Sequence, residues 1–178
     1  MQYLLRVALE GTTLWRLDAI DGKADVAHVA GLICASFGYK AGNDQFLIAD
    51  VKYTAGHGSA VLNPAELVAF ESVVNDCKSF VFIHTLDDGK VLKHQVQVMR
   101  CEEKLFCLMP SVLVGSGCVN FDGEYSLDAM QEYADRDENL TLDIKAATSA
   151  MRAIGSVRAD VSGALVSSGA PDLCFKSV

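Results

Sequence analysis

Apolar and polar side chains alternate over the first 20 residues, and this period of two predicts a pair of β-strands. One face of residues 2–9 carries Tyr3, Leu5, Val7 and Leu9. After a turn at residues 10–13 (EGTT), the second strand covers residues 14–20 and places Trp15, Leu17 and Ala19 on one face. We therefore expect Trp15 to pack as a core anchor and Arg16 to lie on the opposite face, where it could pair with a carboxylate.

The spacing of apolar residues changes to three and four over residues 25–37, which predicts an α-helix that stops at Gly38. The helical stripe consists of Val26, Val29, Ala30, Ile33 and Phe37. The order strand, turn, strand, helix is typical of the opening of an α+β roll or grasp-like fold.

A further strand and a further helix are predicted next. Residues 45–54 have the pattern of a strand, and a flexible loop follows. Asn63 can cap a helix, Pro64 suits its first position, and Glu66 can close a capping box. The inner stripe of this helix would be Leu67, Phe70, Val74 and Cys77.

Residues 82–99 (FIHTLDDGKVLKHQVQVM) predict a β-hairpin around Asp87-Asp88-Gly89. A three-residue loop with Gly89 in the left-handed region would pair Phe82 with His94 and place His84 opposite Leu92. In this register His84 and His94 are diagonal neighbours on one face of the hairpin. A two-residue loop would put them on opposite faces, but the apolar pattern favours the first register.

The C-terminal part predicts a strand at residues 104–109, a loop at 115–125 and a helix at 127–135 that starts after Ser126. A last helix, with Gly155 as its stop, has its stripe at Leu140, Ile144, Ala147, Met151 and Ile154. From residue 156 the pattern fades, and the segment predicts either a strand or a partly mobile tail. We expect one α+β domain, an α/β roll with antiparallel hairpins and helices packed on the sheet, over residues 1–155, and a tail at 156–178.

Composition narrows the class of protein. Hydrophobic residues make up 51% of the 178-residue chain, enough for a packed core, yet no apolar run approaches the roughly 18 residues of a membrane helix. The N-terminus lacks the pattern of a signal peptide, so we expect a cytoplasmic location. The net charge of −8 disfavours binding to nucleic acid, which needs clustered lysine and arginine.

Six cysteines occur without a CxxC spacing: Cys34, Cys77, Cys101, Cys107, Cys118 and Cys174. A chain of this size does not need disulfides, and nothing points to export. We expect these residues to be reduced thiols that are mostly buried.

Several landmarks along the chain resemble one known family. They are Tyr3-x-Leu5-Arg6-Val7-x-Leu9, Trp15-Arg16, the helix end Ala35-x-Phe37-Gly38-Tyr39, Phe46, and the hairpin residues Asp87, Gly89 and His94. Together they resemble the plasmid pRiA4b ORF-3-like family, also described as passenger proteins of insertion elements, of which this chain would be a divergent member. The resemblance covers about residues 1–125. It implies an α/β roll, a bacterial or archaeal origin and a tie to mobile elements, but it supplies no mechanism.

The two hairpin histidines are the main candidates for chemistry. Neighbouring histidines could hold zinc, which needs three or four ligands, and further ligands could come from Cys101, Cys107, Cys118 or His57. The alternative is that His84 and His94 are core histidines whose ring nitrogens are satisfied by hydrogen bonds. The other candidate binding residues are Trp15, Arg16 and Asp87, and Cys118 is a candidate reactive thiol.

Three functional hypotheses follow. The first is a non-enzymatic binding or accessory module that acts through a protein partner, needs no cofactor and is associated with mobile elements. The second is a metal-dependent or small-molecule-acting enzyme that uses His84 and His94, with zinc as its metal. The third is a regulator that contacts or mimics DNA, for which the acidic stretch 132–138 (EYADRDE) could supply the charge. The sequence leaves the oligomeric state open.

Overall fold

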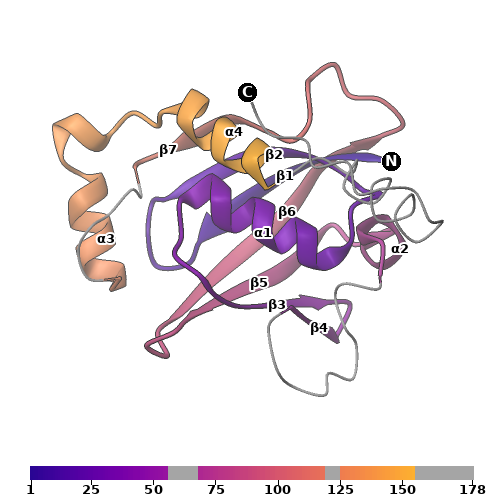
Figure 1. Ribbon diagram of the computed structural model, residues 1–178, viewed down its shortest axis with the longest axis horizontal. Coiled ribbons are helices and arrows are strands. Elements are labelled where there is room, and N and C mark those ends of the chain that lie inside the picture. The colour runs from indigo at the N-terminus through magenta and orange to yellow at the C-terminus, as the bar shows by residue number, and fades with distance from the viewer. Residues whose placement is uncertain (56–67, 119–124, 155–178) are drawn as a thin grey trace, which may run out of the picture.

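The computed structural model describes residues 1–55, 68–118 and 125–154, and its centre is a seven-stranded antiparallel sheet (Figure 1). The strands lie in the order β4-β3-β5-β6-β1-β2-β7. Their bounds are β1 Gln2–Leu9, β2 Trp15–Asp21, β3 Gly42–Ile48, β4 Val51–Ala55, β5 Ser79–Leu86, β6 Val91–Glu102 and β7 Ser111–Ser116. The helices are α1 Val26–Phe37, α2 Phe70–Val74, α3 Leu127–Ala134 and α4 Ile144–Ala153, with a 3₁₀ turn at Asp137–Asn139. The predicted α+β architecture is confirmed.

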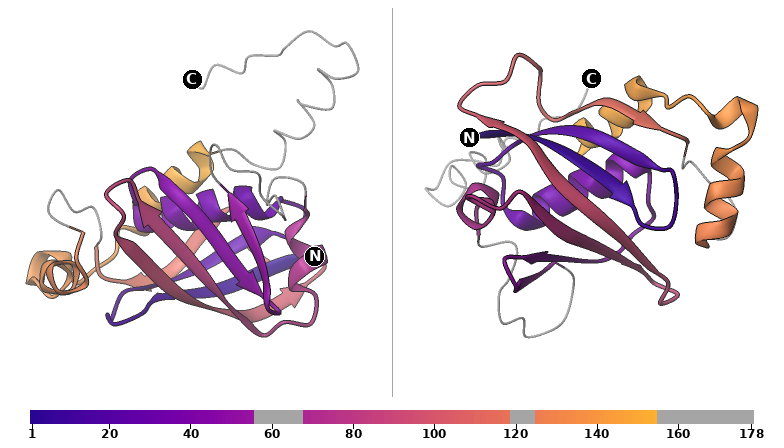
Figure 2. Two further views of the ribbon diagram at one scale, coloured as in Figure 1. Left: turned by 90° about the horizontal axis from the view of Figure 1, so that it is seen from below. Right: turned by 180° about the vertical axis from the view of Figure 1, so that it is seen from behind.

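The helix α1 lies across one face of the sheet with α4 beside it, and the view from behind shows the strands uncovered by any described helix (Figure 2). The core lies between α1 and the sheet. There the inward residues of β1, predicted from their alternation, are all buried with the apolar stripe of α1. As predicted, α1 ends at Gly38, which adopts a left-handed conformation with φ of 74°. None of the described helices is long and apolar enough to span a membrane.

The faces of β2 are the reverse of those predicted. Arg16 and Asp18 are fully buried on the helix side of the sheet, whereas Trp15 is half-buried on the other side. There Arg6 stacks on the Trp15 ring, with its guanidinium carbon 5.2 Å from the ring centroid. Alternation alone favoured the face with more apolar residues. It failed because Ser36 at the end of α1 contacts both residues: its carbonyl accepts from Arg16 and its hydroxyl lies against Asp18.

The predicted strand at residues 45–54 is two strands, β3 and β4, joined by a tight turn. Ile48 pairs with Val51, and the two residues between them, Ala49 and Asp50, have φ of 48° and 63°. Two positive φ values are typical of the type I′ turn, which matches the twist of a hairpin. The turn lacks the usual Asn-Gly signal, so no local pattern predicted it.

The β5–β6 hairpin has the register that the turn chemistry predicted. Phe82 pairs with His94, His84 pairs with Leu92, and the Leu86 amide donates to the carbonyl of Lys90. Gly89 has φ of 84°, as the three-residue loop requires. Both histidines are buried on the helix side of the sheet.

Toward the C-terminus the predictions hold in part. Ser126 caps α3 as expected, accepting a hydrogen bond from the Ala129 amide. Residues 104–109 form no strand, and the chain re-enters the sheet only at β7, after a cis bond at Met109-Pro110. The helix predicted from residue 140 begins at Ile144, because Asp143 provides the cap and Leu140 lies outside with 54% exposure.

Some predictions fall outside the described residues or need correction. The capping box at 63–66, His57, Gly155, Cys174 and the tail at 156–178 lie outside the described part. The five described cysteines form no disulfide, but the expectation of mostly buried thiols is wrong. Cys101 is exposed, and the others are half-buried: Cys34, Cys77, Cys107 and Cys118.

Candidate metal centre

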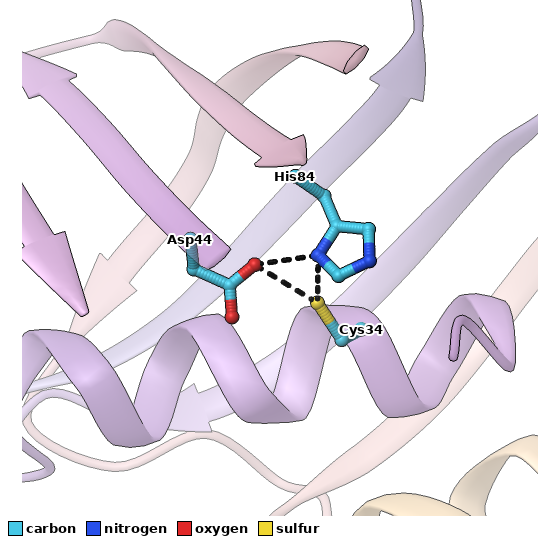
Figure 3. A group of neighbouring side chains, drawn as sticks. All are labelled: Cys34, Asp44 and His84. Carbon is cyan, nitrogen blue, oxygen red and sulfur yellow. Dashed lines mark hydrogen bonds and ion pairs between the residues drawn. The ribbon is translucent and has the colours of Figure 1, made fainter. Parts of the chain in front are cut away.

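Three side chains of different chemistry meet between α1 and the sheet. Cys34 comes from α1, Asp44 from β3 and His84 from β5, and Figure 3 shows their tips facing one another. His84 Nδ1 lies 2.7 Å from Asp44 Oδ1, and the Cys34 sulfur lies 3.4 Å from each of these two atoms. A thiol, a carboxylate and an imidazole nitrogen are the donor types that zinc binds in proteins.

The backbone fixes this meeting point. Asp44 and His84 occupy directly opposed positions in the β3–β5 ladder, so their side chains emerge together on the helix side. Cys34 lies in the last full turn of α1, which packs over these strands. His84 is 1% exposed, while Asp44 and Cys34 are half-buried, so the cluster is enclosed on the His84 side and more open at the other two residues.

Both ring nitrogens of His84 face acceptors. Nδ1 faces Asp44, and Nε2 lies 3.1 Å from the backbone carbonyl of Lys40. A neutral imidazole has one N–H, so it cannot donate to both. A ring that keeps Nε2–H on Lys40 fits this geometry, because the lone pair of Nδ1 can then accept from the Cys34 thiol, 3.4 Å away, or bind a cation. A backbone carbonyl on the far nitrogen is the usual partner of a metal-binding histidine.

The thiol of Cys34 is held in its neutral form when no cation is present. Burial raises the pKa of Cys34 well above its usual value, and the charge of Asp44 and the hydrogen bond to it add to the shift. The neutral thiol donates to Asp44 Oδ1. A bound metal would take the place of this thiol proton, so binding would release a proton.

The separations suit a small tetrahedral ion. Ligand atoms at tetrahedral angles around zinc, with bonds of about 2.0 to 2.3 Å, lie about 3.3 to 3.8 Å apart. The two separations from the Cys34 sulfur fall in this range at 3.4 Å. The 2.7 Å between Asp44 and His84 would have to widen, and this is a movement that a side-chain carboxylate can make. Three protein ligands would leave a fourth position for water or another ligand.

Tyr39 joins this cluster to the second histidine. Its ring stacks on His84 at a centroid distance of 5.3 Å, and its hydroxyl lies 2.8 Å from His94 Nε2. His94 is therefore not a fourth ligand but a neighbour connected through Tyr39. Burial lowers the pKa of His94 to about 3, and nearby His84 adds to the shift, while the backbone at Phe82 and Leu92 opposes it. His94 is thus a neutral core histidine, but among the described residues only its Nε2, and not its Nδ1, has a hydrogen-bond partner.

The other candidate residues lie apart from this cluster. Asp87 is exposed in the hairpin turn, and Trp15 lies on the uncovered face of the sheet. Arg16 and Cys118 line a separate cavity near the end of α1. Within the described part of the chain, the group that could hold a metal contains neither Cys118 nor His94. Of the ligands proposed from sequence that fall within the described ranges, only His84 belongs to it.

Sequence reasoning missed Cys34, Asp44 and Tyr39. Asp44 was invisible because the strand was expected to begin at residue 45, one position too late. Cys34 follows Ala30 by four residues, which places it beside the inner stripe of the helix, and this spacing was the available signal.

Replacing Gly42 with alanine is expected to disturb the centre. A Cβ there would lie 2.8 Å from His84 Cε1 and would collide with the backbone carbonyl of Thr85, which cannot rotate away. We expect a loss of about 1–3 kcal/mol in the free energy of unfolding, measured by urea titration, and a displaced His84 ring. The matched control is Gly31→Ala in α1, where the new Cβ meets only ordinary contacts at 3.7 Å with Ile154. G31A should stabilise the chain by up to about 1 kcal/mol. Equal effects of the two changes would contradict the close packing at Gly42.

Comparison with known proteins adds a fold relative. No protein-family model matches the chain, and no curated protein matches it. Among solved structures, a protein of unknown function, MM3350 from Methanosarcina mazei Go1, is similar with a TM-score of 0.58 and 14% sequence identity. The match covers 74% of this chain and 78% of that one, and it supports the fold alone. The resemblance to the pRiA4b ORF-3-like family stays a prediction.

Proposed function

We propose that this chain is a metal-binding accessory protein that holds a zinc-class ion through Cys34, Asp44 and His84. The observation that carries the proposal is the convergence of these three donor atoms while His84 Nε2 is fixed by the Lys40 carbonyl. A mixed set of thiolate, imidazole and carboxylate favours zinc over calcium or magnesium, which prefer oxygen ligands. The metal-dependent alternative drawn from sequence therefore keeps His84, but replaces His94 with Cys34 and Asp44.

The ion would stabilise the junction of α1 with the sheet. Its ligands come from one helix and two strands that are already paired with each other, so a single ion would cross-link α1 to this strand pair. Binding to the folded state alone stabilises it by about 4 kcal/mol when free metal exceeds the Kd by a thousandfold. We propose this structural and binding role rather than a reaction.

Cobalt titration of the metal-free full chain tests the proposal. Cobalt takes the place of zinc and gives an intense ultraviolet charge-transfer band when a thiolate is a ligand. We expect one equivalent to produce this band, zinc to abolish it by displacement, and both C34S and H84A to weaken binding at least tenfold. Cys107→Ser is the matched control, because Cys107 is also half-buried but lies outside the cluster. A band that survives C34S unchanged, or no band in the wild-type chain, would refute the proposal.

The accessory role in mobile elements rests on the family resemblance and on the absence of a known reaction for that family. It predicts a protein partner rather than a substrate. Affinity capture from the host organism, with and without metal, should recover one partner whose binding depends on Cys34. If a partner binds C34S and the wild type equally well, the accessory role does not depend on the metal site.

A further inference from the structure

A cavity of about 360 Å³ lies between the end of α1, the start of α4 and the residues after β7. It is separate from the cluster of Cys34, Asp44 and His84. Its walls are mostly small or apolar: Ala35, Phe37, Leu142, Ala146, Ala147 and Ala150. Ala146 and Ala150 are exposed, so the cavity opens along the α4 side. A concave apolar site of this size with a few polar groups is the usual form of a small-molecule site.

Arg16 is the cationic group of this cavity. Its side chain is fully buried, and four of its five N–H groups donate to backbone carbonyls of Trp15, Ser36, Ser116 and Gly117. The fifth, on Nη2, has no hydrogen-bond partner among the described residues. The guanidinium carbon lies 4.7 Å from the centroid of Phe37, which fixes the plane of the group. Arg16 is therefore held rigidly with one donor left over.

The charge of Arg16 is not neutralised within the described part of the chain. No carboxylate lies within salt-bridge distance of its nitrogens there, and its four acceptors are uncharged carbonyls. Asp18 is its nearest charge partner on β2, but this carboxyl hydrogen-bonds to Ser36 instead. Asp143 lines the rim of the cavity, where its side chain accepts from the Ala146 amide as the cap of α4. A buried cation whose partners are all uncharged favours an anionic ligand.

We propose that this cavity binds a short aliphatic carboxylate. Its carboxylate would accept the remaining N–H of Arg16, and its tail would lie against the alanines of α4 and Leu142. Charge complementarity selects an anion, and the apolar walls select a hydrocarbon tail over a polar ligand such as phosphate. The proposal is independent of the metal centre, because the two sites share none of their named residues.

Three probes with the same tail test the choice of head group: hexanoate, hexanol and hexylamine. Each is titrated into the ¹⁵N-labelled, metal-free full chain, and amide shifts are followed by NMR. We expect hexanoate to shift the amides of Gly117, Cys118 and residues 146–150 in a saturable way, and the alcohol and amine to bind at least tenfold more weakly. Equal binding of all three would overturn the role of Arg16, and no saturable shift with hexanoate would overturn the site.

A second variant keeps the test clear of folding defects. Arg16 itself is unsuitable, because its removal would leave four carbonyl oxygens unpaired. Ala150→Phe instead fills the cavity from an exposed helix position and should reduce hexanoate affinity at least tenfold. Ser149→Phe adds the same ring to the neighbouring exposed position, which does not line the cavity, and should leave affinity unchanged. Equal affinities of A150F and S149F would place the ligand elsewhere and refute the proposal.

Discussion

As the pH rises from 4 to 8, the free energy of unfolding of the variant Asp18→Asn should increase by about 4 kcal/mol relative to that of the wild type. Asp18 is fully buried on β2, and burial raises its pKa to about 7, while its hydrogen bond with Ser36 and the charge of Arg16 act against the shift. The unfolded chain has an aspartate of ordinary pKa near 4. A difference of about 3 pH units corresponds to about 4 kcal/mol.

The hydrogen bonds of Ser36 are compatible with a protonated Asp18 as well as with an ionised one. The Ser36 hydroxyl lies 2.9 Å from both Asp18 Oδ2 and the carbonyl of Ile33, but it has one proton. If this proton goes to Ile33, the hydroxyl can only accept from Asp18, which must then carry a proton itself. The other oxygen, Oδ1, has no partner among the described residues and so gives no support to a negative charge.

The sign of the pH dependence follows from the direction of this shift. A group whose pKa is raised on folding stabilises the folded chain fully below pH 4, and this stability is lost as the pH rises through 7. Asparagine keeps the shape, can donate to Ser36 and does not titrate, so D18N should lack this loss. Urea unfolding at several pH values measures it. Asp87→Asn, in the exposed hairpin turn, is the control and should track the wild type. Parallel curves for D18N and wild type would show that Asp18 is ionised as usual.

Local patterns could predict the strands whose neighbours are close in sequence. The register of the β5–β6 hairpin could be predicted from Gly89 in the turn and from the apolar pattern of the two strands, because a short turn fixes which residues face each other. The same reasoning failed for β2. There the face that Trp15 and Arg16 occupy depends on α1 and on the end of β7, which are distant in sequence.

The candidate site was hidden for the same reason. Asp44 meets His84 across a pairing of β3 with β5 that is separated by 40 residues, and no local pattern encodes it. Cys34 joins them through the packing of a helix on a sheet. Only His84 lay in a segment whose geometry could be worked out locally, so it was found without its partners.

Several polar residues of the sheet form a band on the side of α1. Asp44, which is half-buried, and the buried His84 and His94 lie on the adjacent strands β3, β5 and β6, and the buried Arg16 lies on β2, beyond the apolar β1. Above them, the last turn of α1 and the residues after it contribute Cys34, Ser36 and Tyr39. The apolar core therefore lies toward the start of α1, and the chemistry is concentrated at its end. Burial along this band shifts pKa values in opposite directions for an acid and a base.

Replacing His94 with glutamine should therefore give the opposite pH dependence to that of D18N. His94 is fully buried, and its pKa of about 3 compares with about 6.5 in an unfolded chain. A base whose pKa is lowered on folding contributes stability above pH 6.5, and this stability is lost as the pH falls toward 3. The difference corresponds to about 5 kcal/mol over the whole range. His94 Nδ1 has no hydrogen-bond partner among the described residues, and the backbone at Phe82 and Leu92 offsets the effect of burial only in part.

Glutamine suits the test because its amide can reach the position of Nε2 and keep the 2.8 Å contact with the Tyr39 hydroxyl. Urea unfolding should show that wild type loses stability relative to H94Q by about 3 kcal/mol between pH 7 and pH 4. Between pH 4 and pH 6.5 the contributions of Asp18 and His94 have opposite slopes and should cancel in the wild-type chain. The free energy of unfolding of D18N should then fall as the pH is lowered, and that of H94Q should fall as the pH is raised. The double variant should show neither change. Wild type and H94Q with the same slope over this range would mean that His94 is protonated inside the fold, which its buried place beside Phe37 and Phe82 argues against.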